Sequence, residues 1–164
     1  MKPRAEGISL TYVETPVGPL RLAADDQALQ SLEFAHVNKA ANPTTPATGI
    51  LEETIRQLRA YFSGKLEQFD LPLAPEGTPF QLEVWRRLCE IPYGETISYG
   101  ELARRIGNPN ASRAVGLANG SNPIAIIIPC HRVIGSNGKL TGYGGGLPIK
   151  EKLLALERGQ LRLL

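Results

Sequence analysis

The first part of the chain alternates apolar and polar positions in three short runs within residues 8–34. Turn-forming residues separate these runs at positions 15–19 and at Asp25-Asp26. Alternating runs joined by short turns are typical of hairpin-connected strands. We therefore predict a small antiparallel meander, followed by a loop over residues 36–48, which hold two prolines and several small polar residues.

Residues 51–62 place apolar side chains three or four positions apart and stop at Ser63-Gly64, which predicts a helix. Residues 71–77 hold two prolines and a glycine, so we interpret them as a linker. The chain would then consist of an N-terminal domain over residues 1–76 and a C-terminal domain over residues 77–164.

The second half begins with a clear helix start. In Thr78-Pro79-Phe80-Gln81, threonine at the N-cap and glutamine at the third helical position form a capping box. Ser98-Tyr99-Gly100-Glu101 repeats this device. A turn at Asn108-Pro109-Asn110 then leads into a short helix over residues 111–118, and two short helices joined by a tight turn resemble a helix-turn-helix. The fold class is α+β, with a small antiparallel sheet followed by a mostly helical domain.

Composition narrows the class of protein. Hydrophobic residues make up 42% of the 164 residues, which is enough for a core. Two cysteines do not make a disulfide framework, and with no apolar leader or membrane-length segment we expect a cytoplasmic protein without membrane contact. Residues 1–75 carry 7 Lys and Arg against 9 Asp and Glu, whereas residues 76–164 carry 11 against 7. This positive bias fits a nucleic-acid partner, although ordinary scatter of surface charge explains it equally well.

One segment near the C-terminus carries the strongest chemical signal. The apolar run at residues 124–128 is rich in β-branched side chains and predicts a buried strand. Pro129 cannot donate to a strand ladder, so the strand should end there and present Cys130. A strand end over a core holds a thiol rigidly within reach, so we predict that Cys130 is reactive. Cys89, on a predicted buried helix, is expected to pack in the core.

A free thiol has a pKa of roughly 8.5, so Cys130 needs a base or a positive partner at neutral pH. His131 is a candidate base, and a water molecule is one way to bridge these two sequence neighbours. A histidine base needs a third group to orient it. Glu157 lies in the last turn of a predicted helix over residues 149–156, where the helix dipole disfavours a carboxylate. It either accepts a proton from His131 or is a solvated surface residue.

Two further segments allow two interpretations each. The helix over residues 111–118 carries mostly small side chains, with Arg113 as its long polar residue. It either packs closely against neighbouring helices or enters a narrow groove, such as the minor groove of DNA, about 6 Å wide. The glycine-rich stretch at residues 135–146 either walls a small pocket, with Tyr143 as a lid, or forms a plain surface hairpin.

With these residues in view, the chain resembles the O6-alkylguanine-DNA alkyltransferases, and closely the bacterial stand-alone type. The match is strong over residues 78–157 and holds in outline for the N-terminal half. The resemblance implies a ribonuclease H-like N-terminal domain and a winged helix-turn-helix domain that carries the active-site cysteine. The matching motifs are Ser98-Tyr99-Gly100, Arg113-Ala114-Val115-Gly116, Asn119-Gly120-Ser121-Asn122-Pro123, Pro129-Cys130-His131-Arg132-Val133 and Gly142-Tyr143 with Gly145-Gly146.

The resemblance implies direct reversal of DNA alkylation. The family flips the damaged guanine out of the duplex, and its cysteine takes the alkyl group irreversibly, so each molecule acts once. O4-alkylthymine would be a second substrate. Cys130 would be the acceptor, His131 would take the thiol proton through a water, and Glu157 would hold His131. Asn122 would steady the backbone near the site, and Tyr143 would shape the pocket wall.

The resemblance also assigns residues to the base and to DNA. Tyr99 would contact the flipped nucleotide and help neutralise the leaving purine, while Lys150 and the backbone N–H of Gly144 would lie near O6. The backbone carbonyls of Cys130 and Val133 would accept from the guanine amino group. Arg113 would fill the gap left by the flipped base. The residues expected to contact DNA are Ala111, Ser112, Arg113, Ala114, Gly116 and Tyr99.

Some family members bind zinc through N-terminal cysteine and histidine residues that this chain lacks, so we expect no metal and no cofactor. The partner would be double-stranded DNA containing O6-alkylguanine, bound by a monomer with no obligate protein partner. Some members carry proline at the position of Ala125 and serine at that of Gly144, which leaves the tolerated alkyl size open.

Two other functions remain as alternatives. A non-catalytic protein that recognises alkylated bases would carry another residue at the cysteine position, so Cys130 argues against it. A Cys-His-Glu hydrolase would need an oxyanion hole, and the sequence identifies no paired donors for one. Turnover separates the three functions, because a hydrolase cycles, an alkyltransferase stops at one equivalent and a binding protein never reacts.

Overall fold

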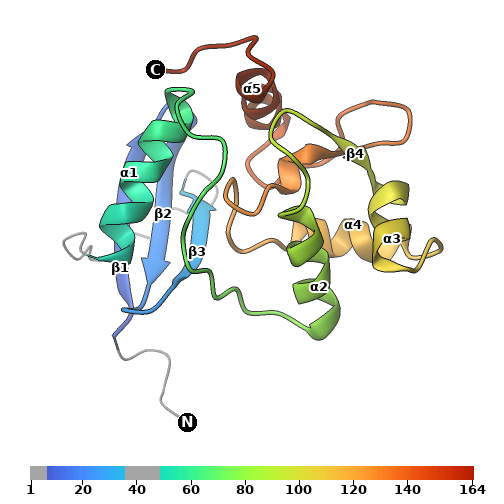
Figure 1. Cartoon of the computed structure of the whole chain (residues 1–164), viewed down its shortest axis with the longest axis horizontal. Helices are drawn as coiled ribbons and strands as arrows, with labels where there is room; N and C mark the ends of the chain where they lie inside the picture. The colour runs from blue at the N-terminus through green and yellow to red at the C-terminus, as the bar shows by residue number, and fades with distance from the viewer. Residues whose placement is uncertain (1–6, 36–48) are drawn as a thin grey trace.

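The structure is a computed structural model, and it describes residues 7–35 and 49–164. The loop predicted over residues 36–48 lies outside the described residues. Figure 1 shows the sheet and its covering helix on one side of the molecule and the remaining helices on the other. The elements in chain order are β1 (Ser9–Thr15), β2 (Gly18–Ala24), β3 (Leu29–Phe34), α1 (Ile50–Phe62), α2 (Pro79–Leu88), β4 (Ile97–Ser98), α3 (Tyr99–Ile106), α4 (Ser112–Gly120), the 3₁₀ turn η1 (Cys130–Arg132), β5 (Val133–Ile134) and α5 (Leu147–Glu157).

The predicted meander is confirmed. β1, β2 and β3 pair antiparallel in that order, and Leu22 of β2 lies opposite both Thr11 and Leu32 in the register. Leu20 and Leu22 are fully buried, because the alternating pattern turns one face of the sheet toward the core. α1 covers the sheet (Figure 1), and it ends as predicted, with Gly64 in a left-handed conformation at φ 75°.

Two capping signals explain where α2 and α3 begin. At α2, Thr78 Oγ1 accepts from the Gln81 backbone N–H at 3.1 Å, and Gln81 Oε1 accepts from the Thr78 N–H at 2.9 Å. This is the complete capping box that the sequence predicts. At α3 only half of the predicted box forms. Ser98 Oγ accepts from the Glu101 N–H at 3.0 Å, whereas the Glu101 carboxylate pairs with Arg104 and Arg105 one turn further along.

The helix-turn-helix is formed by α3 and α4. Gly107, at φ 86°, ends α3 in the left-handed conformation that suits glycine. The inner face of α4 is buried against α2 and α3, and the Trp85 indole N–H donates to the Ala118 carbonyl at 2.8 Å. One face of α4 is therefore anchored in the core, and its outer face is held rigidly at the surface.

The prediction of a strand over residues 124–128 is wrong. Only Ile124 pairs, through a parallel bridge to Leu32 of β3, and the chain then turns. The Ile127 N–H donates to the Ala125 carbonyl at 2.8 Å, and Ile126 adopts a positive φ of 70°, which is unusual for a β-branched residue. Burial accounts for the apolar composition of this run, since all five residues are buried, and composition alone does not distinguish a buried turn from a buried strand.

The two halves of the chain share one core. Buried residues from the sheet, α1, α2, α4 and α5 form a single hydrophobic cluster. The predicted linker runs beside β3, because the Leu29 N–H donates to the Pro72 carbonyl at 2.9 Å and the Ala74 N–H donates to the Leu29 carbonyl at 2.8 Å. The division at residues 76 and 77 remains a prediction.

Candidate active site

Cys130 lies at the first position of η1, not at the end of a strand. Pro129, at φ −82° and ψ 64°, forms a three-residue turn in which the Cys130 N–H donates to the Ile128 carbonyl at 2.8 Å. The 3₁₀ turn follows directly, and the Arg132 N–H donates to the Pro129 carbonyl at 3.0 Å. Cys130 is a free cysteine with only 6% of its surface exposed. Tight turns in the backbone therefore hold the thiol in place.

Behind Cys130 lies a buried ionic cluster centred on Glu157 of α5. The His131 ring contacts Glu157 Oε2 through Nε2 at 2.7 Å. Arg132 donates from Nε to Oε1 at 2.7 Å and from Nη2 to Oε2 at 3.0 Å. Tyr61 of α1 donates its hydroxyl to Oε2 at 2.6 Å. The sequence left Glu157 as either an orienting acid or a solvated residue, and the geometry excludes the second because its side chain is fully buried.

The cluster sets the protonation states of its members. Burial alone raises the pKa of Glu157, but hydrogen bonds and charges from His131 and Arg132 outweigh it and lower that pKa to about 2. Burial lowers the pKa of His131 in spite of the neighbouring carboxylate. At neutral pH the site therefore holds an ionised Glu157 and a neutral imidazole. With a carboxylate at Nε2, the neutral ring carries its proton there and leaves Nδ1 as the acceptor.

The thiol and the acceptor nitrogen belong to residues that are neighbours in sequence. His131 Nδ1 is buried and has no hydrogen-bond partner among the described residues. Burial raises the pKa of Cys130, opposed by a hydrogen bond from Asn122 and the charge of Lys150. Asn122 also donates to the Ile128 carbonyl at 2.7 Å and accepts from the Ile124 N–H at 3.0 Å. Asn122 thus contacts both the thiol and the turn that carries it.

Lys150 of α5 is completely buried beside the thiol. Its ammonium donates to the Val133 carbonyl at 2.7 Å and to the Thr141 carbonyl at 2.9 Å, and burial lowers its pKa. An ammonium has three donors, so two hold the backbone of the site and the third is not used by these bonds. The Thr141 hydroxyl donates to the Tyr99 hydroxyl oxygen at 3.0 Å. These contacts connect α3, β5 and α5 around the glycine-rich loop.

Tyr143 and Gly145 of this loop pack against the N-terminal sheet. The Tyr143 ring meets Phe34 of β3 edge-on, with centroids 5.6 Å apart. A Cβ atom on Gly145 would lie only 2.8 Å from the same ring, so no other residue fits there without a shift. Burial raises the pKa of Tyr143 well above its ordinary value, and its hydroxyl has no hydrogen-bond partner among the described residues. Gly144, between them, is exposed.

Five of the six predicted DNA-contacting residues lie on α4 or at its N-cap, and the sixth, Tyr99, begins α3. Arg113 and Ala114 are exposed, while Ser112, Gly116 and the N-cap residue Ala111 are half-buried. Leu117 lies one turn after Arg113 and has 76% of its surface exposed, the largest fraction for any large hydrophobic residue in the described ranges. The inner face of α4 thus packs on helices, as the first interpretation predicts, and its outer face is exposed. Entry of this helix into a narrow groove stays a prediction.

Sequence reasoning missed three residues that contact this site, and one exposed residue of α4, Leu117. Arg132 lies within the Pro-Cys-His-Arg motif, so the motif itself offered a signal. Leu117 was detectable as an apolar residue on the outer face of α4. Asn119, whose Nδ2 donates to the Cys130 carbonyl at 3.4 Å, belongs to a quoted motif. Tyr61 had no local signal, because it is 96 residues from Glu157.

The core position predicted for Cys89 is wrong. Cys89 caps the C-terminus of α2, after the last buried position of the helix, and is exposed. The helical pattern predicted a buried side chain there, but α2 ends one residue earlier, at Leu88. Cys89 is therefore a suitable control thiol for experiments on Cys130.

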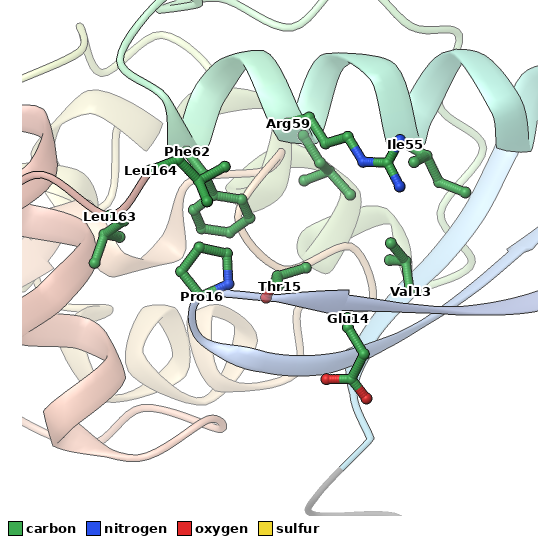
Figure 2. Close-up of a pocket in the computed structure, with 10 residues that line it drawn as sticks. Val13, Glu14, Thr15, Pro16, Ile55, Arg59, Phe62, Leu163 and Leu164 are labelled. Carbon is green, nitrogen blue, oxygen red and sulfur yellow. The ribbon is translucent and has the colours of Figure 1, made fainter.

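An apolar groove lies away from this chemistry. A cavity of about 440 Å³ lies between α1, the β1–β2 turn and the C-terminal residues. Figure 2 shows Phe62 close to Pro16, with Leu163 and Leu164 at one end. The cavity includes none of the predicted site residues. In residues 7–35 and 49–164, no group of three or more His, Cys, Asp or Glu side chains could hold a metal ion. Over the same ranges no helix is long and apolar enough to cross a membrane.

Comparisons with known proteins agree with this geometry. Residues 8–75 match the family model for the ribonuclease-like domain of 6-O-methylguanine DNA methyltransferase, and residues 79–159 match the model for its DNA binding domain. The chain is 60% identical over 155 residues to the methylated-DNA–protein-cysteine methyltransferase of Methanosarcina barkeri, covering 92% of this chain and 97% of that protein. It is 53% identical over 150 residues to the enzyme of that name from Mycobacterium tuberculosis, covering 90% and 91%.

The fold also matches solved structures. The crystal structure of Mycobacterium tuberculosis OGT in complex with DNA superposes with a TM-score of 0.84 at 52% identity, covering 92% of this chain and 93% of that one. An O6-methylguanine DNA methyltransferase from Methanococcus jannaschii superposes with a TM-score of 0.67 at 25% identity, covering 91% and 92%. The predicted fold class is thereby confirmed. The chain belongs to the 6-O-methylguanine DNA methyltransferase family.

Proposed function

We propose that this protein repairs DNA by direct reversal, transferring the alkyl group of O6-alkylguanine to Cys130 once and irreversibly. The observation that carries the proposal is the arrangement of His131, which offers an unpartnered Nδ1 next to Cys130 in sequence while Nε2 is held by Glu157. Membership of the family and the DNA named in the Mycobacterium tuberculosis OGT structure support it.

The transfer is a displacement at the alkyl carbon. The thiol proton passes to His131 Nδ1 through a water, and the resulting imidazolium is stabilised by ionised Glu157. The Cys130 sulfur forms a bond to the alkyl carbon while the bond from that carbon to O6 breaks, and the electron pair leaves with the purine. The third N–H of Lys150 and the Gly144 N–H are the donors proposed for O6, and Tyr99 is proposed to neutralise the leaving base. Asn122 keeps the turn in place.

The remaining roles concern base choice and DNA. The Cys130 and Val133 carbonyls are proposed to accept from the guanine amino group, with Tyr143 as one wall of the pocket. α4 is proposed to lie in the minor groove, where Arg113 fills the gap left by the flipped base. A carbonyl has two lone pairs, so the bond from Lys150 to Val133 leaves one for the base. The proposed assembly is a monomer on double-stranded DNA, with no metal and no cofactor.

Intact mass spectrometry tests this function. Incubation with a duplex containing O6-methylguanine should add one methyl group per protein molecule and never a second. Trypsin places the two thiols in different peptides, residues 88–104 and residues 114–132, and the methyl group should appear only on the second. Tight binding to the lesion without any gain in mass would instead support the non-catalytic recognition protein. Continued turnover without protein alkylation would support a hydrolase.

We expect Arg113→Ala to slow transfer from a duplex about tenfold to a hundredfold, because unstacking a base costs a few kcal/mol that the inserted side chain partly offsets. The rate with free O6-methylguanine base should stay the same, since no flipping is needed. Single-turnover rates with the two substrates measure this. Arg59→Ala, which removes an exposed positive charge from α1, is the matched control and should leave both rates unchanged. Equal slowing with the free base would contradict a role in flipping.

A further inference from the structure

Tyr61 brings a polar group from the N-terminal half of the chain into the site. It lies in the last turn of α1, is completely buried and donates its hydroxyl to Glu157 Oε2 at 2.6 Å. A buried hydroxyl is costly unless it is hydrogen-bonded, and the bond to Glu157 satisfies it. The ring is packed among Phe62, Phe69 and Tyr93, with centroid separations of 5.3, 5.3 and 6.3 Å. Phenylalanine would satisfy this packing, so the hydroxyl has a different purpose.

The Tyr61 bond adds to the hydrogen bonding of the Glu157 carboxylate. Oε1 accepts from Arg132 Nε, and Oε2 accepts from Tyr61, His131 and Arg132 Nη2. A carboxylate offers about four acceptor positions, two on each oxygen, so the donors crowd on Oε2 and Oε1 keeps one position free. Tyr61 and His131 share one oxygen, at 2.6 and 2.7 Å, which couples the phenol directly to the imidazole.

We propose that Tyr61 is a positioning residue for alkyl transfer, whose hydroxyl holds the Glu157 carboxylate in the orientation that His131 needs. The inference rests on the proposed function and adds a residue from the N-terminal half to its machinery. Tyr61 does not touch the reacting atoms, since it acts through Glu157. The two halves of the chain therefore act as one unit, and the N-terminal half contributes to the chemistry as well as to the fold.

The proposed role of Tyr61 predicts a change in how the transfer rate depends on pH. Several charged or titratable groups face Glu157 and His131. Burial lowers the pKa of His131 most, and the charges of Arg132 and of Lys150 in α5 lower it further. Arg132 also contacts Glu157, and Tyr93 is close enough to Arg132 for a cation–π contact. None of these changes when Tyr61 loses its hydroxyl. Glu157 then becomes a stronger acceptor, which stabilises protonated His131 and raises its pKa. Because the base must be neutral, the acid limb of the transfer rate should move to higher pH.

The test is Tyr61→Phe, studied in the full chain with single-turnover transfer from an O6-methylguanine duplex across pH. We expect the rate constant at neutral pH to fall about fivefold, the factor typical of one net hydrogen bond. We also expect the acid limb to move upward in pH and the His131 Nε2–H proton resonance to move downfield. The chain has two histidines, so a His36→Gln background assigns that resonance.

The matched control is Leu58→Val on the same helix. Leu58 is almost fully buried and forms none of the contacts to Glu157, and the change removes one methylene from the core. It should lower the urea midpoint without moving the pH profile or the His131 resonance. If Tyr61→Phe behaves like Leu58→Val, with a lower urea midpoint but an unchanged pH profile and an unchanged His131 resonance, Tyr61 is only a packing residue and the proposal is wrong.

Failure of the proposed function would look different. If the wild-type protein transfers no methyl group, no transfer rate can be measured and the proposed function is wrong. The His131 resonance then decides whether Tyr61 positions the carboxylate. A downfield move in Tyr61→Phe supports that coupling, and an unchanged resonance overturns it.

Discussion

Cys130→Ser should abolish methyl transfer completely while leaving binding to the alkylated duplex intact. A serine hydroxyl is nearly the same size as the thiol but is a much weaker acid, so His131 cannot generate the nucleophile at neutral pH. Intact mass should therefore show no added methyl group after prolonged incubation. Gel-shift or anisotropy titrations should give an affinity for the lesion close to that of the wild type, because α4 and the pocket are unaltered.

Cys89→Ser is the control for this prediction. Cys89 is the only other cysteine in the sequence, and it lies exposed at the end of α2. Desolvation of its partly covered thiol and the charge of Glu90 raise its pKa, with the charge of Arg132 opposing them, and unlike Cys130 it has no histidine beside it in the sequence. The variant should gain one methyl group at the wild-type rate. A methyl group on the Cys130→Ser protein would mean that the acceptor has been misassigned.

Glu157→Gln should lower the free energy of unfolding by about 3–5 kcal/mol, because it leaves the buried Arg132 guanidinium without its counter-charge. Transfer should also slow strongly, since the amide neither selects the Nε2–H tautomer nor stabilises protonated His131. Urea unfolding at neutral pH measures the first effect and single-turnover kinetics the second. Glu83→Gln is the control, because Glu83 pairs with Arg86 and Arg87 at the surface, where solvent screens such pairs and they contribute little to stability. Similar losses in both variants would contradict a special role for Glu157.

The same prediction has a pH dependence. The pKa of Glu157 is lowered from 4.5 to about 2 in the folded protein, so the unfolded chain takes up the proton first as the pH falls. The stabilisation by ionised Glu157 is fully present above about pH 4.5 and is lost as the pH falls toward 2. The difference in unfolding free energy between wild type and Glu157→Gln should therefore shrink through that window. A difference that stays constant down to pH 3 would place the pKa of Glu157 elsewhere.

The contrast between Ile124 and Thr78 shows which predictions from sequence are safe. The capping box at Thr78 and Gln81 formed as predicted, because its two hydrogen bonds join residues three positions apart. The box at Ser98 formed in half, because two arginines compete for the Glu101 carboxylate. The strand over residues 124–128 did not form, because a strand needs a partner and only Ile124 found one, at Leu32. The apolar composition of residues 124–128 predicts that they are buried, but it does not predict their backbone conformation.

By itself, the sequence determined the meander, the capped starts of α2 and α3 and the helix-turn-helix, since each depends on neighbouring residues or on a short motif. The motif around Cys130 also carries the prediction that this is the reactive thiol. The tertiary structure alone decided that Glu157 is buried, that Lys150 holds the Val133 carbonyl and that Tyr61 reaches the site. These contacts join residues from 17 to 96 positions apart. Their energies depend on desolvation and on directed hydrogen bonds, which exist only once the core around α1, η1 and α5 has closed.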